Sequence, residues 1–122
     1  MLNYLLVFLG GGLGSICRFG IAQWLTPHKL HFPWATIIAN VLACLVLGVL
    51  VGLSMKNKLG SPLSFFLMVG FCGGFSTFST FTNETFQLMA VGDWEKALAN
   101  VAVSLLVCLF SLFVGIKTAQ LV

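Results

Sequence analysis

The residues best suited to chemistry lie in one stretch, GFCGGFSTFSTF, at positions 70–81. After the glycines, phenylalanine recurs at every third residue with a Ser–Thr pair between successive rings. Because a helical turn has 3.6 residues, Phe78 and Phe81 would lie near one face, with Ser79 and Thr80 on the flanking faces. Hydroxyl groups donate hydrogen bonds without a charge, and phenyl edges are partly positive. Phenylalanines at this spacing usually serve packing alone. The interleaved hydroxyl groups favour a second interpretation, the lining of a pore that binds a small anion weakly enough to release it.

A second polar group, Asn40, lies inside an apolar stretch with Thr36 four residues before it and Cys44 four residues after it. Residues four apart share one face of a helix. An asparagine in a membrane helix often makes a helix–helix hydrogen bond, so packing alone also explains this residue. Its amide N–H groups could equally donate to an anion.

A third polar pattern comprises Asn100, Ser104, Cys108 and Ser111, again at helical spacing among Val, Leu and Phe. Small and polar residues let membrane helices approach each other closely, so packing is one interpretation. The continuity of the stripe along most of the segment favours the other interpretation, a polar path.

The residues around these groups are predominantly apolar. Of the 122 residues, 59% are hydrophobic and 7% are charged, whereas about a quarter of a soluble domain is charged. A helix needs roughly 20 mainly apolar residues to cross a bilayer. We therefore predict an all-α membrane protein, a single transmembrane domain over residues 1–122, with four spans at about 3–25, 33–55, 62–91 and 97–116.

The third span should be broken near its middle. Gly70, Gly73 and Gly74 weaken a helix and permit unusual backbone angles. A break inside a membrane is tolerated only where the freed backbone groups find partners or a wet cavity. Exposed carbonyl groups at such breaks can coordinate a cation.

The positive charges do not favour one orientation in the membrane. In a four-span arrangement, each side of the membrane carries three positive charges. One side holds Lys56, Lys58 and Lys117, and the other holds Arg18, Lys29 and Lys96. The chain could therefore insert in both orientations, and two opposed copies could pair about a two-fold axis in the membrane plane.

The four cysteines, Cys17, Cys44, Cys72 and Cys108, all lie in apolar runs, and no two form a C-x-x-C motif. We interpret them as small buried apolar residues, not metal ligands. The net charge of +3 and the lack of a basic cluster argue against nucleic acid. No nucleotide-binding motif is present, which excludes a self-contained pump, and we expect no enzyme.

The chain resembles a known family, the small bacterial fluoride channels called Fluc or CrcB. The shared motifs span nearly the whole chain in order: GGGLGSICR at 10–18, TIIANVLACLVLG at 36–48, GFCGGFSTFSTF at 70–81 and ANVAVS at 99–104. One departure is Ser76, where the family usually has threonine.

The resemblance implies an antiparallel, dual-topology homodimer in the lipid bilayer with two fluoride pores. A structural sodium ion at the dimer centre would be held by the main-chain carbonyl groups of Gly73 and Ser76 from both subunits. Phe78 and Phe81 would line the pore, and Asn40 would donate to fluoride. The polar lining would also include Ser79, Thr80 and Ser104.

Two charged residues inside the spans remain open. Arg18 resembles the family's first-span arginine, and either holds the broken-helix carbonyl groups or attracts anions into a vestibule. The first role is favoured, because a deep charge facing the ion would bind it too tightly. Glu84 could meet water at the pore mouth, pair with Arg18 or a lysine, or take part in proton coupling.

The resemblance thus predicts a fluoride-selective passive channel, in the bacterial inner membrane, that exports fluoride and relieves its toxicity; the residues alone indicate only a small anion. One alternative is a proton-coupled exporter of the small multidrug type, which needs a membrane-embedded carboxylate. The first span offers no acid, and only Glu84 supports this idea. The other alternative is a non-transporting membrane subunit, which would not explain the FSTFST pattern beside a helix break.

Overall fold

The computed structural model describes residues 1–28 and 31–122, so the positive charge counted at Lys29 lies outside the described residues. Within these ranges all regular secondary structure is helical. Four helical segments are long and apolar enough to cross a membrane, Leu2–His28, Trp34–Met55, Ser61–Ala90 and Trp94–Leu121. The predicted all-helical architecture with four spans is therefore confirmed.

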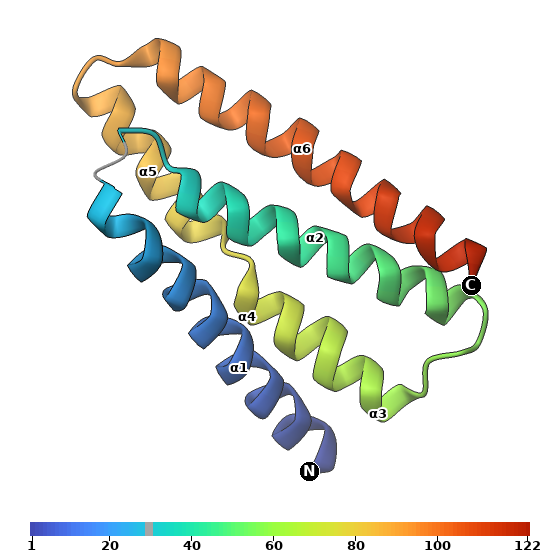
Figure 1. The fold of residues 1–122 in the computed structure, drawn as a ribbon. Helices are drawn as coiled ribbons and strands as arrows, with labels where there is room; N and C mark the ends of the chain where they lie inside the picture. The colour runs from blue at the N-terminus through green and yellow to red at the C-terminus, as the bar shows by residue number, and fades with distance from the viewer. Residues whose placement is uncertain (29–30) are drawn as a thin grey trace.

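The individual helices follow the chain in order. They are α1 (Leu2–Leu25), η1 (Thr26–His28), α2 (Trp34–Met55), α3 (Ser61–Ser64), η2 (Phe65–Cys72), α4 (Gly73–Phe75), α5 (Phe78–Ala90) and α6 (Trp94–Leu121). The third span consists of α3, η2, α4 and α5. Both termini and the connection from α2 to α3 lie at one end of the bundle (Figure 1).

The four spans are arranged so that α1 and α6 lie at opposite edges of the bundle (Figure 1). α6 packs along α2, and α1 packs along η2 and α4 of the third span. The third span and α2 therefore lie between the two edge helices, and any site built from them lies in the middle of the bundle.

Glycines allow α1 and the third span to approach backbone to backbone. A Cβ atom added to Gly10 would collide with the carbonyl oxygen of Phe66, and one added to Gly14 with the carbonyl oxygen of Phe71. A Cβ atom on Gly74 would in turn collide with the backbone of α1. Small residues at such contacts are how membrane helices gain close packing, so these glycines fix the position of α4 against α1.

The helix break is real, but it lies just after the glycines. Gly73 has ordinary helical angles, φ −64° and ψ −37°. The chain leaves the helix at Ser76 (φ −78°, ψ 157°) and Thr77 (φ −151°, ψ 116°), and α5 begins at Phe78. The expectation that the glycines break the helix is therefore wrong in its mechanism. The glycines are needed for close packing, whereas two non-glycine residues adopt the extended backbone.

The segment before the break is also wound differently from the expected α-helix. Residues Phe65–Cys72 form the π-helix η2. Such segments are rare and short in proteins and occur frequently at functional sites. No residue type in FFLMVGFC predicted this winding.

A small core anchors the break to its neighbours. Ala39 and Ala43 of α2 pack with Phe75, the last residue of α4, and all three are buried. Ile21 and Phe71 pack against this cluster. The end of α4 is thus held in place on the side of α2 that also carries Asn40.

The fourth span, α6, is longer than the predicted residues 97–116. The Asp93 carboxylate accepts a hydrogen bond from the backbone N–H of Lys96 (3.4 Å) and forms an ion pair with its Nζ atom (2.9 Å). These interactions with Lys96 hold the pKa of Asp93 below its ordinary value. At the other end, Lys56 Nζ donates to the carbonyl oxygens of Ala119 (3.2 Å) and Gln120 (2.7 Å). A capped N-terminus and a cation at the C-terminus both stabilise a helix, which extends α6 at each end.

Candidate functional site

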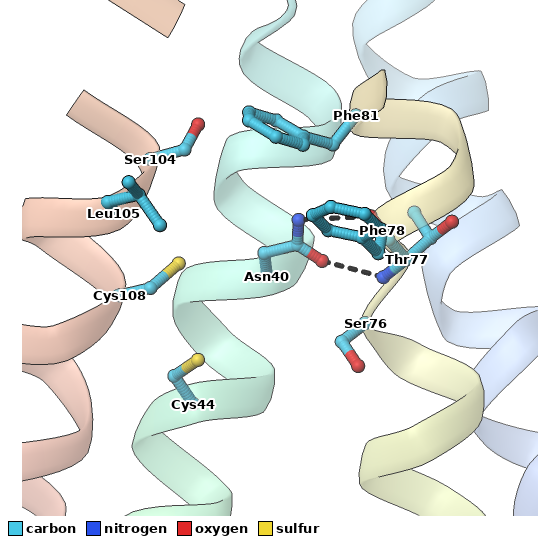
Figure 2. A pocket seen from close by; sticks show the side chains of 9 residues that line it. All are labelled: Asn40, Cys44, Ser76, Thr77, Phe78, Phe81, Ser104, Leu105 and Cys108. Atoms are coloured by element: carbon cyan, nitrogen blue, oxygen red, sulfur yellow. Dashed lines mark hydrogen bonds between the residues drawn. The ribbon is translucent and has the colours of Figure 1, made fainter. Parts of the chain in front are cut away.

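The break in the third span is bridged by Asn40 of α2. Its Oδ1 atom accepts a hydrogen bond from the backbone N–H of Thr77 (2.7 Å), and its Nδ2 atom donates to the carbonyl oxygen of Thr77 (3.3 Å). Figure 2 shows the amide of Asn40 directed at the extended residues. A backbone N–H group without a partner costs several kcal/mol in a membrane. Asn40 removes this cost by accepting the hydrogen bond of the Thr77 N–H.

Thr77 also begins the next helix. Its Oγ1 atom accepts a hydrogen bond from the backbone N–H of Thr80 (3.3 Å), which is the usual action of a threonine at a helix N-terminus. Thr77 Oγ1 further donates to Thr80 Oγ1 (3.1 Å) and lies 3.3 Å from Ser79 Oγ. The hydroxyl groups of Ser79 and Thr80 therefore form a local cluster around Thr77.

Among the carbonyl groups before the break, those of Gly73 and Ser76 lose their helical donors. In an unbroken α-helix, the N–H of Thr77 would donate to Gly73 and the N–H of Thr80 would donate to Ser76. Here the first N–H donates to Asn40 and the second to Thr77 Oγ1. The carbonyl groups of Gly73 and Ser76 therefore lose their helical donors, which is what a carbonyl ligand of a cation requires.

The carbonyl group of Gly74, one of the two between Gly73 and Ser76, has other partners. Arg18 Nε donates to the carbonyl oxygen of Gly74 (3.2 Å), and Ser15 Oγ lies 3.5 Å from the same atom. Arg18 thus binds a carbonyl group at the end of α4, in agreement with the first of the two roles considered for it. Charged donors at a helix C-terminus also interact favourably with the helix dipole.

A cavity of about 230 Å³ opens beside the break. It lies between α2, α6 and the start of α5 (Figure 2), and nine residues line it, Asn40, Cys44, Ser76, Thr77, Phe78, Phe81, Ser104, Leu105 and Cys108. The rings of Phe78 and Phe81 lie next to each other, with their centroids 5.7 Å apart and their planes tilted by 38°. No charged side chain belongs to this lining.

The lining offers donors of two kinds. The amide nitrogen of Asn40 carries two N–H groups, and one of them is used by Thr77. The other remains for a ligand in the cavity. Ser104 Oγ, by contrast, donates its proton to Asn100 Oδ1 (3.3 Å). Ser104 can serve an anion only after its hydroxyl group turns away from Asn100.

Asn100 itself belongs to the packing between α6 and α5. It is buried, and its Nδ2 atom donates to Thr85 Oγ1 (2.8 Å), whose proton goes to the carbonyl oxygen of Phe81 (2.8 Å). Ser111 of the same stripe is buried and does not line the cavity. The polar stripe on α6 therefore divides into packing residues and two residues, Ser104 and Cys108, that face the cavity.

A second, smaller cavity of about 130 Å³ lies on the other side of the break. Arg18, Thr36, Thr80 and Glu84 are among its lining residues. Glu84 Oε1 accepts a hydrogen bond from Thr36 Oγ1 (2.7 Å), whereas Glu84 Oε2 is buried and meets no donor among the described residues. Within the same residues no salt bridge joins Glu84 to an arginine or lysine.

This arrangement can hold a small anion but offers little for other chemistry. The larger cavity combines the amide donor of Asn40 with the rings of Phe78 and Phe81 and no charged side chain. Its three hydroxyl groups, of Ser76, Thr77 and Ser104, donate their protons within the protein. The amide and the ring edges can replace part of the water shell of an anion and still release it. Among residues 1–28 and 31–122, no group of three His, Cys, Asp or Glu side chains is placed to hold a metal ion.

Comparison with known proteins assigns the chain to a family. Residues 5–116 match the CrcB-like protein family, which is also described as Camphor Resistance (CrcB). The chain belongs to the CrcB-like family. Proteins named fluoride-specific ion channel FluC are 40% identical in Shewanella sp. (strain ANA-3), 39% in Shewanella oneidensis (strain MR-1) and 38% in Shewanella baltica (strain OS185). Each similarity covers 116 residues and 94% of both chains. The resemblance inferred from the motifs is thus confirmed, and the chain is a multi-pass membrane protein.

Within this CrcB-like chain, the structure brings together some of the predicted site residues and separates others. Asn40, Phe78, Phe81 and Ser104 line the larger cavity with Ser76. Thr80 lines the smaller cavity with Arg18, and Ser79 belongs to neither lining. Gly73 lines a third cavity, of about 140 Å³, with Ser76. The individual roles of these residues stay predictions.

Sequence reasoning missed Thr77 altogether. Its backbone N–H donates to Asn40, its carbonyl oxygen accepts from Asn40, and its side chain caps the N-terminus of α5. A threonine directly before the first apolar residue of a helix, here Phe78, is a recognisable helix start. That signal was present in the sequence, but the repeating pattern of phenylalanines obscured it.

Proposed function

We propose that this protein is a fluoride-selective passive channel in the bacterial inner membrane that exports fluoride from the cytoplasm. The names of its CrcB-like relatives support fluoride as the ion. Hydrogen fluoride crosses membranes as a neutral weak acid and dissociates in a near-neutral cytoplasm, where the anion accumulates. A passive pore then drains the anion and relieves its toxicity, helped by the negative interior.

The observation that carries the proposal is the meeting of Asn40, Phe78 and Phe81 at one uncharged cavity beside the break. A small anion that sheds water needs donors on several sides. Asn40 supplies an N–H group, and the ring edges supply weaker positive potential. Because none of these groups carries a full charge, the anion is held weakly enough to move on.

The functional unit is proposed to be an antiparallel homodimer. Phe78 is 77% exposed in the single chain, although it lines the cavity. A pore-lining ring this exposed needs a second wall, and an inverted copy of the same chain supplies one. The balanced positive charges predicted from the sequence support insertion in both orientations.

A structural sodium ion is proposed at the centre of this dimer. The carbonyl groups of Gly73 and Ser76 lose their helical donors at the break, which supports their use as ligands. Gly73 is exposed, and a Cβ atom added to it would meet no atom within 4 Å. Two copies of Gly73 and Ser76 would therefore have room to meet around one ion, which would hold the two subunits together.

Anion efflux from liposomes that contain the purified protein tests the function. Vesicles loaded with potassium fluoride or potassium chloride are diluted into an impermeant salt, and a potassium ionophore starts the flux. The proposal expects rapid fluoride efflux and chloride efflux near that of protein-free vesicles. Equal efflux of both anions would refute selectivity for fluoride.

Two variants connect this flux to the cavity. Phe78→Ile and Phe81→Ile remove the ring edges but keep an apolar side chain, so each should slow fluoride efflux while the protein still folds. Phe110→Ile is the matched control, because Phe110 is an exposed ring on α6 that does not line the cavity. Unchanged efflux in both cavity variants would mean that the rings serve packing alone.

A further inference from the structure

Two of the four cysteines face the larger cavity. Cys44 lies on α2 and Cys108 on α6, and both line the space that also holds Asn40 and Phe81. The other two differ in position, because Cys72 is buried and Cys17 is exposed on α1. The expectation that all four are buried apolar residues is therefore wrong for Cys17, and only partly right for Cys44 and Cys108, which are half-buried.

The two cavity thiols come from neighbouring helices and line the same space. Figure 2 shows the sulfur atoms of Cys44 and Cys108 in the space between α2 and α6, two helices that pack along each other. Both are free thiols. Two thiols that line one cavity from adjacent helices can serve as a ligand set for a metal ion that accepts two sulfur ligands.

We propose that Cys44 and Cys108 form a two-coordinate site for a soft monovalent metal ion, Cu⁺ or Ag⁺, inside the anion path. Thiolate ligands select soft ions over hard ones, and two-sulfur coordination is the preferred arrangement of both ions. The described residues offer no third side chain to complete a larger coordination shell. This favours an ion that needs only two ligands over zinc, which takes four.

The charge balance of the site predicts its effect. Two neutral thiols bind one monovalent ion and release two protons, which leaves a metal–dithiolate unit with one net negative charge. This unit lies in the same cavity as the amide N–H of Asn40. A fixed negative charge there repels an incoming anion, so the bound metal closes the path. This consequence for flux rests on the proposed function, whereas the metal binding does not.

Binding is measured first, without any flux. In a Cys17→Ser and Cys72→Ser background, calorimetric titration with silver nitrate in chloride-free detergent solution should give one Ag⁺ per chain. Proton release into a weakly buffered solution should accompany it. Adding Cys44→Ser or Cys108→Ser should weaken Ag⁺ binding at least about tenfold, because a single remaining thiol cannot chelate. An unchanged affinity in both variants would overturn the site.

A second measurement needs no variant. Ag⁺ should protect Cys44 and Cys108 together from a small alkylating reagent in the unaltered, folded protein, as mass spectrometry of the peptides would show. Protection of Cys44 together with Cys72, which shares a neighbouring cavity with it, would contradict the assignment. Protection of neither thiol would contradict it as well.

The flux measurement then tests the consequence. In liposomes with nitrate or sulfate salts, Ag⁺ should inhibit fluoride efflux in the unaltered chain and equally in Cys17→Ser. Relative to its own silver-free rate, each of Cys44→Ser and Cys108→Ser should need at least about tenfold more Ag⁺ for the same inhibition. Equal sensitivity in all variants would refute closure of the path. A chain without any fluoride flux would refute the proposed function and leave the binding results to decide the site.

Discussion

Replacing Asn40 by aspartate tests how the cavity distinguishes a donor from a charge. The change keeps the size of the side chain and keeps an oxygen that can accept from the N–H of Thr77. It removes the N–H that donates to the Thr77 carbonyl oxygen and also the second N–H of the amide. It also places a negative charge in the cavity that is proposed as the path of the anion.

The expected effect of Asn40→Asp is large. Two unit charges about 4 Å apart interact by about 4 kcal/mol at an effective dielectric constant of about 20. At 1.4 kcal/mol for each factor of ten, the repulsion slows fluoride entry roughly a thousandfold. The lost hydrogen bond to Thr77 costs only about 1 kcal/mol of stability, so the protein should still fold. Asn40→Ala should slow efflux less than Asn40→Asp, because it removes the donor without adding a charge.

Fluoride efflux from liposomes measures this at neutral pH, with thermal unfolding in detergent as the check on folding. Asn83→Asp is the matched control, because Asn83 is an exposed residue of α5 that does not line the cavity. It adds the same charge to the same chain and should change efflux little. If Asn40→Asp conducted fluoride as fast as the unaltered chain, Asn40 would not lie on the path and its role would be to bridge the break alone.

Three further predictions follow from the contacts. Gly14→Ala should destabilise the fold by about 1–3 kcal/mol in thermal unfolding, because its Cβ atom would collide with the backbone of the third span. The Cβ atom of the control, Gly12→Ala, would meet no atom within 4 Å, so this substitution should be neutral or slightly stabilising. Arg18→Gln should lower thermal stability by about 1.5–3 kcal/mol through the lost charged hydrogen bond at the end of α4, while the preference for fluoride over chloride in efflux should stay. Because Lys96 lowers the pKa of Asp93, this pair contributes its full stabilisation at a pH above 3.8, the ordinary pKa of aspartate. The contribution is lost as the pH falls through the lowered pKa. Asp93→Asn should remove that part of the pH dependence of thermal unfolding.

The overall fold could be predicted because its signals are local. Four apolar runs of sufficient length specify four spans, and the loops between them hold most of the charges. The location of the break was predicted to within a few residues, but its cause was not. The presence of a glycine does not show whether the position needs unusual backbone angles or a close approach of two helices. The close approach depends on the partner helix, which the local sequence does not identify. Gly73 and Gly74 are helical, and Gly74 lies against the backbone of α1.

The candidate site was predictable where one helix face defines it. Phe78 and Phe81 share a face by spacing alone, and the structure places both at the cavity. The spacing of Thr36, Asn40 and Cys44 showed which face of α2 carries Asn40. It could not show that Asn40 forms hydrogen bonds with Thr77, because Thr77 is 37 residues away in the sequence. The different positions of Asn100 and Ser104 could not be predicted for the same reason. Helical spacing puts both on one stripe but does not tell which one packs against α5 and which one reaches the cavity.

The geometry of the break links the stability of the fold to the proposed conduction, because Asn40 takes part in both. An interrupted membrane helix must find partners for its freed groups, and here Asn40 and Arg18 supply them from neighbouring helices. Asn40 uses one side of its amide for the break and keeps one N–H for the cavity. Any substitution that removes its donor therefore also loosens the break. Asn40→Asp and Asn40→Ala both lose the donor to the Thr77 carbonyl group, but only the aspartate keeps an acceptor for the Thr77 N–H. Asn40→Ala should therefore lower thermal stability more and fluoride efflux less than Asn40→Asp, and this opposite order separates support of the break from charge repulsion in the cavity.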